Sequence, residues 1–292
     1  MSPQCLRLWN TPHLRSIYGC NSCKFNKAVL CEHKNGDYFI EDFTLYNTVI
    51  SALQWRKLNG DIYMCTDSIG AAYYKKLGLE KVWNGVLPII PDDMEEINPE
   101  MFWAAGKLIA LREFDRNCAL VDEDFIVWKK LELSQKAVTC AHREDLMPDV
   151  YPDPYCFGVD FPLLDRLDKS VLPCNTAFLY IPDKSLRELY VNQSIAFMKS
   201  AQDCSDYLCH MVFAEQRLLA MLCGFTNTLV ETLLDKDKLF VAQDDYTHLW
   251  GAKQALRDNP QFREDFLAKC RKRIRTDFPE YEYVIEAIEK NG

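Results

Sequence analysis

Short apolar runs alternate with segments of helical periodicity over the first half of the chain, and this alternation restricts the folds open to it. Three apolar runs are bounded by polar or turn-forming residues, as in strands buried on both faces; they span residues 62–65, 85–90 and 118–121. Helical spacing marks residues 41–58, 69–77 and 99–113. The alternation predicts an α/β fold with a mostly parallel central sheet flanked by helices.

The second half of the chain continues this pattern after a long polar, proline-bearing stretch at residues 140–173, which we interpret as a functional loop. We expect strands at 176–181 and 238–242, helices at 184–202 and 206–224, and two amphipathic helices from residue 261 onward. The organisation predicted is one principal domain over residues 1–257 with a helical C-terminal extension over 258–292.

Composition and charge exclude several classes of partner. The chain has 292 residues, of which 48% are hydrophobic, and a net charge of -9, which argues against binding to nucleic acid or an anionic membrane. Its start lacks the apolar core of a signal peptide, and no stretch approaches the roughly 18 apolar residues of a transmembrane helix. We therefore expect a cytoplasmic protein with no transmembrane segment, whose 13 cysteines are mostly small buried hydrophobes.

Two aspartates follow the third apolar run directly, in the sequence VDEDF at residues 121–125. In extended geometry Asp122 and Asp124 point to one side, where their oxygens suit Mg²⁺ or Mn²⁺. Asp67 follows the first apolar run in the same way, and ligands of α/β sheets gather at such strand ends. A second Asp-x-Asp, Asp235 and Asp237, lies in a polar loop and is interpreted as solvated surface.

A second group of polar residues lies in THLWGAKQ, residues 247–254. The imidazole of His248 could add a third metal ligand, Gly251 allows close approach to a phosphate, and Lys253 can neutralise diphosphate charge. The alternative is that His248 is a hydrogen-bonded structural residue. Asp245, just ahead of it, could act as an acid or base, or simply solvate the loop.

Glu215 falls in the middle of the apolar face of the helix expected at 206–224. A buried carboxylate is costly unless it is paired or functional, so Glu215 could bind a substrate hydroxyl or act as a base. The alternative is an ion pair in the core. Gln216 beside it could hydrogen-bond substrate hydroxyls.

The order of six motifs resembles that of GT-A-fold glycosyltransferases, in particular bacterial glycosyltransferase-like proteins and, distantly, retaining enzymes of the glycogenin and lipopolysaccharide-galactosyltransferase type. The motifs are TDSIG, WAAGKLIAL, ALVDEDFIVWKKL, PCNTAFLYI, FAEQRLLAML and HLWGAK, and they cover about residues 61–253. The resemblance implies a GT-A-like, Rossmann-like fold. It also implies an enzyme that transfers a sugar from a nucleoside-diphosphate sugar, expected to be a UDP-sugar, to a glycan or other hydroxyl acceptor.

The resemblance also assigns roles to individual residues. Asp122, Asp124 and His248 would match the metal ligands, with Mn²⁺ or Mg²⁺ bridging to the nucleoside diphosphate. The nucleotide and diphosphate contacts would include Lys107, Gly251 and Lys253, although the retaining enzymes place that lysine one position later and follow it with Pro-Trp. Asn175 would match an asparagine of the acceptor-side strand, its alternative being a turn residue.

Two further hypotheses stay open on the sequence. One is a non-catalytic nucleotide-sugar or carbohydrate-binding protein on the same fold. The other is a zinc-stapled interaction module in residues 1–40, because Cys20, Cys23, Cys31 and His33 lie within fourteen positions of one another, although the second pair is unusually close.

Overall fold

Helices and short strands alternate through the described part of the chain. The structure is a computed structural model that describes residues 31–34, 37–92, 94, 96–114, 117–201, 207–239, 244–249 and 252–291. The strands are β1 (Cys31–Lys34), β2 (Asp37–Ile40), β3 (Tyr63–Cys65), β4 (Gly85–Leu87), β5 (Ala119–Val121), β6 (Phe125–Val127), β7 (Ala137–Arg143), β8 (Cys174–Tyr180), β9 (Leu229–Thr232) and β10 (Tyr246–His248). The helices are α2 (Asp42–Leu58), α3 (Ser68–Lys76), α4 (Ala105–Glu113), α5 (Lys184–Ser200), α6 (Tyr207–Val212), α7 (Leu218–Phe225), α8 (Lys253–Asp258), α9 (Pro260–Asp277) and α10 (Tyr283–Glu289).

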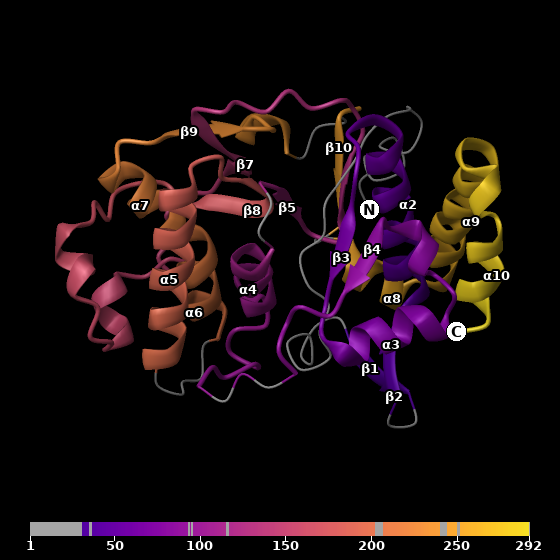
Figure 1. The fold of residues 1–292 in the computed structure, drawn as a ribbon, viewed down its shortest axis with the longest axis horizontal. Coiled ribbons are helices and arrows are strands. Elements are labelled where there is room, and N and C mark those ends of the chain that lie inside the picture. Colours follow the sequence, from indigo (N-terminus) through magenta and orange to yellow (C-terminus); the bar gives the residue numbers. More distant parts are fainter. Residues whose placement is uncertain are drawn as a thin grey trace.

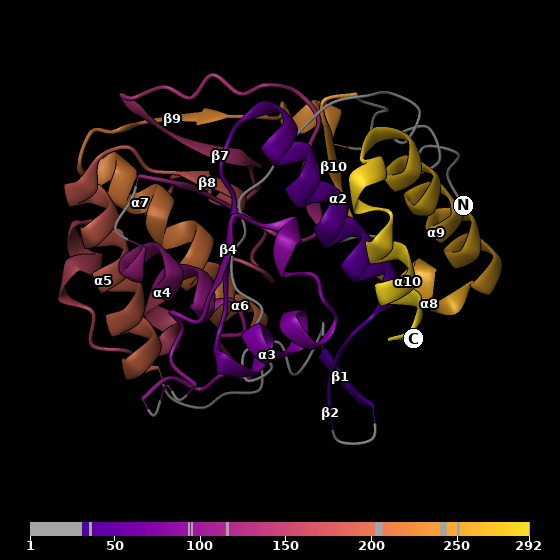
Figure 2. The same cartoon turned by 45° about the vertical axis from the view of Figure 1, so that its right-hand side comes forward.

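The largest described sheet has the order β5-β8-β7-β9 and carries α4, α5, α6 and α7 on one side (Figure 1). The parallel pair β3–β4 lies beside α2 and α3 in the other half of the molecule, where α8, α9 and α10 also lie. The antiparallel pair β6–β10 connects the two halves, because β6 follows β5 after a tight turn and packs against α2. Figure 2 shows the same division from a second direction.

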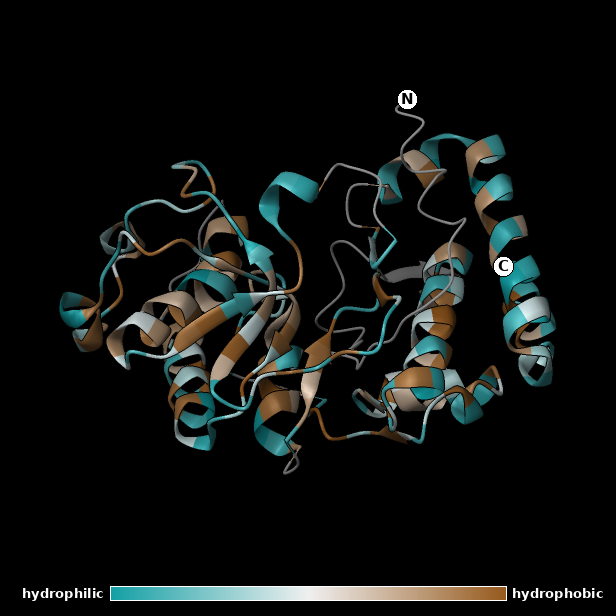
Figure 3. Ribbon diagram, turned by 90° about the horizontal axis from the view of Figure 1, so that it is seen from above, coloured by the Kyte–Doolittle hydropathy of each residue, from teal (hydrophilic) through white to brown (hydrophobic). Residues whose placement is uncertain are grey.

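Side chains alternate across the large sheet between two hydrophobic clusters, as strand geometry requires. Ala119 and Val121 of β5 join the cluster formed with α2 and α9, whereas Leu120 between them joins the cluster formed with α4, α5 and α7. The C-terminal helices show hydrophilic and hydrophobic residues in alternation along their length (Figure 3), and the hydrophobic ones, such as Ile274, pack in the same cluster as α2.

The α/β class expected from the sequence is confirmed, but the sheets are mixed and not mostly parallel. Only β3–β4 and β7–β9 are parallel among the described pairings, and β8 runs antiparallel to both of its neighbours. Apolar runs show that strands are buried but not which way they run, so the pattern could not reveal this reversal.

Several expected elements differ in their limits. The helix expected at 99–113 begins only at Ala105, and the first residues of the expected 140–173 loop belong to β7. The rest of that loop contains two short 3₁₀ helices, Pro154–Phe157 and Pro162–Arg166. The prediction of a strand at 238–242 is wrong at its first residue, because Lys236–Lys238 forms a 3₁₀ turn. Residues 240–243 lie outside the described residues.

The helical stretch Tyr207–Phe225 joins α6 and α7 through a π-helical turn at Phe213–Arg217. Of the described helices, this stretch alone is long and apolar enough to cross a membrane by composition, and 78% of it is buried inside the protein. It packs against α5 as a core helix.

Candidate functional site

Asp122 and Asp124 lie in a tight turn between β5 and β6. The amide of Asp122 donates to the carbonyl of Ala177 on β8 (2.8 Å), and the amide of Phe125 donates to the carbonyl of Asp122 (3.0 Å). The extended geometry expected from the sequence is therefore wrong here. Because the backbone turns between them, the two carboxylates reach different partners.

The carboxylate of Asp122 lies 2.6 Å from the ammonium of Lys107, which comes from α4. Lys107 also pairs with Glu215 and donates to the carbonyl of Thr176 (3.2 Å), while the Thr176 hydroxyl donates to Glu215 (2.6 Å). Lys107 and Glu215 are buried, with exposures of 8% and 6%. Lys107 is thus buried and ion-paired, and it is not a solvent-exposed lysine on the helix surface.

The opposing charges set the pKa values of this group. Burial lowers the pKa of Lys107, but the carboxylates of Asp122 and Glu215 outweigh burial and raise it above its ordinary value. Burial raises the pKa of Asp122, and the negative charges of Glu215 and Asp124 add to this against the opposing effect of Lys107. Asp122 therefore interacts electrostatically both with Lys107 and Glu215 and with Asp124.

Glu215 is aimed at Lys107 by the π-helical turn Phe213–Arg217. Such a turn leaves helix carbonyls without their usual partners, and π-helical turns occur frequently at functional sites. Here α5 supplies the missing donors: the Tyr190 hydroxyl donates to the carbonyl of Glu215 (2.6 Å), and Ser194 donates to that of Ala214 (2.8 Å). The burial predicted for Glu215 is confirmed.

Asp124 is held by two groups from the C-terminal part of the chain. One carboxylate oxygen lies 2.8 Å from the ammonium of Lys253, and the other lies 3.6 Å from Nε2 of His248. Burial raises the pKa of Asp124, but Lys253 and His248 outweigh it and hold that pKa well below its usual range. Lys253 is the first residue of α8, and its ammonium reaches the turn. It does so although the retaining enzymes place the corresponding lysine one position later in the sequence.

Two buried polar side chains of α2 fix the turn itself. The amide of Asn47 donates to the carbonyl of Glu123 (2.7 Å), and the Ser51 hydroxyl donates to that of Phe125 (2.8 Å). On the other side β10 pairs with β6, placing His248 opposite Phe125, and the Leu249 amide donates to the carbonyl of Asp124 (3.0 Å). The chain therefore positions both aspartates through backbone contacts.

We use the name charged cluster for the six side chains that these contacts bring together: Lys107, Asp122, Asp124, Glu215, His248 and Lys253. Three of them are carboxylates and two are ammonium groups. The cluster is largely removed from water, and its most accessible carboxylate is that of Asp122, whose side chain is 30% exposed.

The remaining residues expected at the site lie apart from the charged cluster or cannot be placed. Asp67 is fully buried and caps α3, accepting from the amide of Gly70 (2.7 Å). Asp245 forms an exposed pair with Lys129 (2.8 Å). Gly251 lies outside the described residues, as do Cys20 and Cys23 of the hypothetical zinc module.

Asn175 and Gln216 belong to a neighbouring polar region. Asn175 donates to Glu144 (2.8 Å), and Gln216 accepts from the Tyr151 hydroxyl (2.8 Å). The sequence offered no signal for Glu144 or for Thr176, which hydrogen-bonds to Lys107 and Glu215, because neither residue interrupts an apolar pattern.

The donor set fits a hard divalent cation that keeps water or substrate oxygens in its shell. No three His, Cys, Asp or Glu side chains within the described part of the chain converge as a preformed metal site. Mg²⁺ and Mn²⁺ commonly need only one or two protein carboxylates, so Asp124 and His248 can serve together. Asp122 can join them only if the cation replaces its contact with Lys107.

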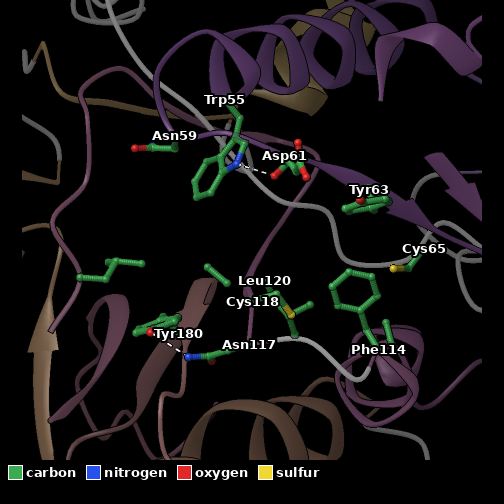
Figure 4. A pocket seen from close by; sticks show the side chains of 13 residues that line it. Trp55, Asn59, Asp61, Tyr63, Cys65, Phe114, Asn117, Cys118, Leu120 and Tyr180 are labelled. Carbon is green, nitrogen blue, oxygen red and sulfur yellow. Dashed lines mark hydrogen bonds between the residues drawn. The ribbon is translucent and has the colours of Figure 1, made fainter. Parts of the chain in front are cut away.

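A cavity of about 290 Å³ lies between β3 and the beginning of β5 (Figure 4). Aromatic side chains including Trp55, Tyr63 and Phe114 line it, and the Trp55 indole donates to the carbonyl of Asp61 at its edge (2.8 Å). The cavity touches the start of β5, whereas Asp122 follows the end of that strand. It is therefore separate from the charged cluster.

No protein-family model matches the chain, and no curated protein has a significantly similar sequence.

Proposed function

We propose that this protein is a metal-dependent glycosyltransferase that transfers a sugar from a nucleoside-diphosphate sugar, such as a UDP-sugar, to a hydroxyl acceptor such as a glycan. The observation that carries the proposal is the charged cluster at the end of β5. Carboxylates outnumber ammonium groups there, and they are held in a largely buried position. Ligands of α/β folds often bind beyond the carboxyl ends of strands, and this cluster follows the carboxyl end of β5.

The charges of the cluster match the two requirements of diphosphate chemistry. Its excess of carboxylates favours a cation, and its two lysines can stabilise the negative charge that develops on a departing diphosphate. Lys107 and Lys253 stay protonated because each is paired with carboxylates.

Asp124 and His248 would hold the Mn²⁺ or Mg²⁺ ion, with Asp122 as a third ligand. When bound, the ion would neutralise charge on the diphosphate oxygens. Lys253 would move from Asp124 toward the diphosphate, and Lys107 would keep the Glu215 side chain oriented. Lys107 lies between the aspartate turn and Glu215. The sugar and its acceptor would bind on the side of Glu215 and Gln216.

The same proposal assigns residues 1–257 to a GT-A-like catalytic domain and 258–292 to a helical extension, in a cytoplasmic protein. The packing of α9 against α2 supports an extension that stabilises the helix holding the aspartate turn. The region where β7 ends and β8 begins would face the transferred sugar and its acceptor.

A screen of nucleotide sugars with and without Mn²⁺ tests the proposal. Thermal unfolding should shift upward with a UDP- or GDP-sugar only when Mn²⁺ is present, because ligands that bind the folded state stabilise it. The double variant D122N/D124N should lose this shift. The chain offers a matched control in D235N/D237N, which changes the same motif in an exposed loop.

Release of UDP or GDP from the same sugars separates catalysis from binding. Release that depends on Mn²⁺ and on Asp124 supports the transferase. Tight binding without release or transfer supports instead a non-catalytic nucleotide-sugar-binding protein on this fold. If no nucleotide sugar binds, both proposals are wrong.

A further inference from the structure

A second polar group lies beside the charged cluster, where β7 ends and β8 begins. His142 and Asn175 are direct partners across these two strands, and Glu144 follows β7. The pairing is shifted between Cys140 and His142, which marks a β-bulge. Bulges redirect side chains and occur frequently next to active sites.

The carboxylate of Glu144 is fixed at one oxygen and free at the other. Oε1 accepts from the amide of Asn175 (2.8 Å) and lies 3.7 Å from Nε2 of His142. Asn175 is itself held, because its side-chain oxygen accepts from the amide of Ala177 (3.1 Å). Oε2 of Glu144 has no partner among the residues that the structure describes, and the side chain is 25% exposed.

His142 leaves a buried acceptor in the same place. Its Nδ1 donates to the carbonyl of Arg143 (3.2 Å), which leaves Nε2 as an acceptor in the neutral ring. The residue is 2% exposed, and Nε2 finds no hydrogen-bond partner in the described part of the chain. Nε2 and Oε1 of Glu144 are thus two acceptors facing each other, an arrangement that lacks a donor.

Electrostatic effects connect this group to the charged cluster. Burial raises the pKa of Tyr151, and the charges of Glu144 and Glu215 both raise it further. Tyr151 therefore lies within range of both carboxylates, and its hydroxyl donates to Gln216. Carboxylate, amide and phenol groups suit hydroxyl-rich ligands, and the negative charge of Glu144 disfavours a phosphate.

We propose that Glu144 binds a hydroxyl of the donor sugar through its free oxygen, and that Asn175 is a positioning residue that holds its carboxylate in place. This inference rests on the proposed function, since the sugar is delivered by the nucleotide. Glu144 then helps to decide which sugar is accepted, while the charged cluster binds the diphosphate that all donors share.

Isothermal titration separates the two roles by comparing each nucleotide with its sugar derivatives. The probes are UDP, UDP-glucose, UDP-galactose and UDP-N-acetylglucosamine, and GDP with GDP-mannose, all with Mn²⁺. The variant E144Q should weaken the best nucleotide sugar about tenfold or more, because it removes a charged hydrogen bond, and leave its parent nucleotide within about twofold. The variant N175A should weaken the same sugar in the same selective way.

The control E231Q changes an exposed glutamate on β9, the strand next to β7, and should leave every affinity unchanged. Urea unfolding of each variant identifies any that fail to fold, and the milder variant E144D then replaces E144Q. If E144Q binds the nucleotide and its sugars in the wild-type ratio, this inference is overturned and the proposed function stands. If the wild type binds neither UDP nor GDP, the proposed function and this inference both fail.

Discussion

Replacing Lys107 with methionine tests whether the charged cluster is a coupled buried unit. The change removes the only cation that contacts Asp122 and Glu215 among the described residues and leaves two carboxylates without it. Breaking a buried ion pair at one partner costs about 3–5 kcal/mol of folding free energy. The 30% exposure of the Asp122 side chain lets water solvate that carboxylate, so we expect a loss near the lower end, about 3 kcal/mol.

Urea unfolding followed by tryptophan fluorescence measures this loss. The matched control is Lys184→Met, because Lys184 and Glu188 form an exposed pair at 3.5 Å whose side chains are 75% and 60% exposed. That control should lose less than about 0.5 kcal/mol. If Lys107→Met costs no more than the control, the buried cluster does not exist in solution as described.

A double variant that also neutralises Glu215 tests whether Lys107 and Glu215 are energetically coupled. The double variant Lys107→Met, Glu215→Gln removes one of the unpaired charges and should recover part of the stability lost in Lys107→Met. Simple addition of the two single effects would show that the two side chains are not coupled.

Three further predictions concern groups around the site. Tyr190→Phe should cost about 1–2 kcal/mol in urea unfolding, because it removes the donor to the Glu215 carbonyl in the π-helical turn; an unchanged midpoint would contradict that contact. Arg257→Met should cost about 2 kcal/mol, because it leaves buried Glu41 without its two-point partner from α8, and a loss equal to that of an exposed arginine would refute this. Burial lowers the pKa of His142 in the folded protein below its ordinary value of 6.5, so the contribution of His142 to folding stability is full above that pH and falls as the unfolded chain takes up a proton. The difference in unfolding free energy between wild type and His142→Gln should therefore shrink from pH 7 to pH 5. A difference that grows over this range would contradict the lowered pKa.

Periodicity predicted those features that depend on burial alone. The apolar spacing at 41–58 located α2 within one residue, and the run before Asp122 located β5. The position of Glu215 on an apolar helix face predicted its burial, because a carboxylate in such a stripe has no other orientation. The spacing could not name its partner, since Lys107 lies 108 residues earlier.

The features that escaped prediction depend on backbone direction and local turns. Asp122 and Asp124 were expected on one side of an extended strand, but the hydrogen bond from Phe125 to Asp122 makes a turn that no side-chain period records. The β-bulge that aims His142 is likewise a matter of strand pairing. In the sequence Asn47 and Ser51 look like ordinary polar residues of a helix, because nothing near them indicates the turn at residues 122–125 to which they donate.

Calorimetric titration of Mn²⁺ and UDP into wild type and Asp124→Asn tests the central claim most directly. The account predicts that UDP binds wild type at least about tenfold more tightly with Mn²⁺ than without it, and that Asp124→Asn abolishes this difference while Asp237→Asn retains it. Equal Mn²⁺ dependence in Asp124→Asn and wild type would show that the cation and the diphosphate do not meet at the charged cluster.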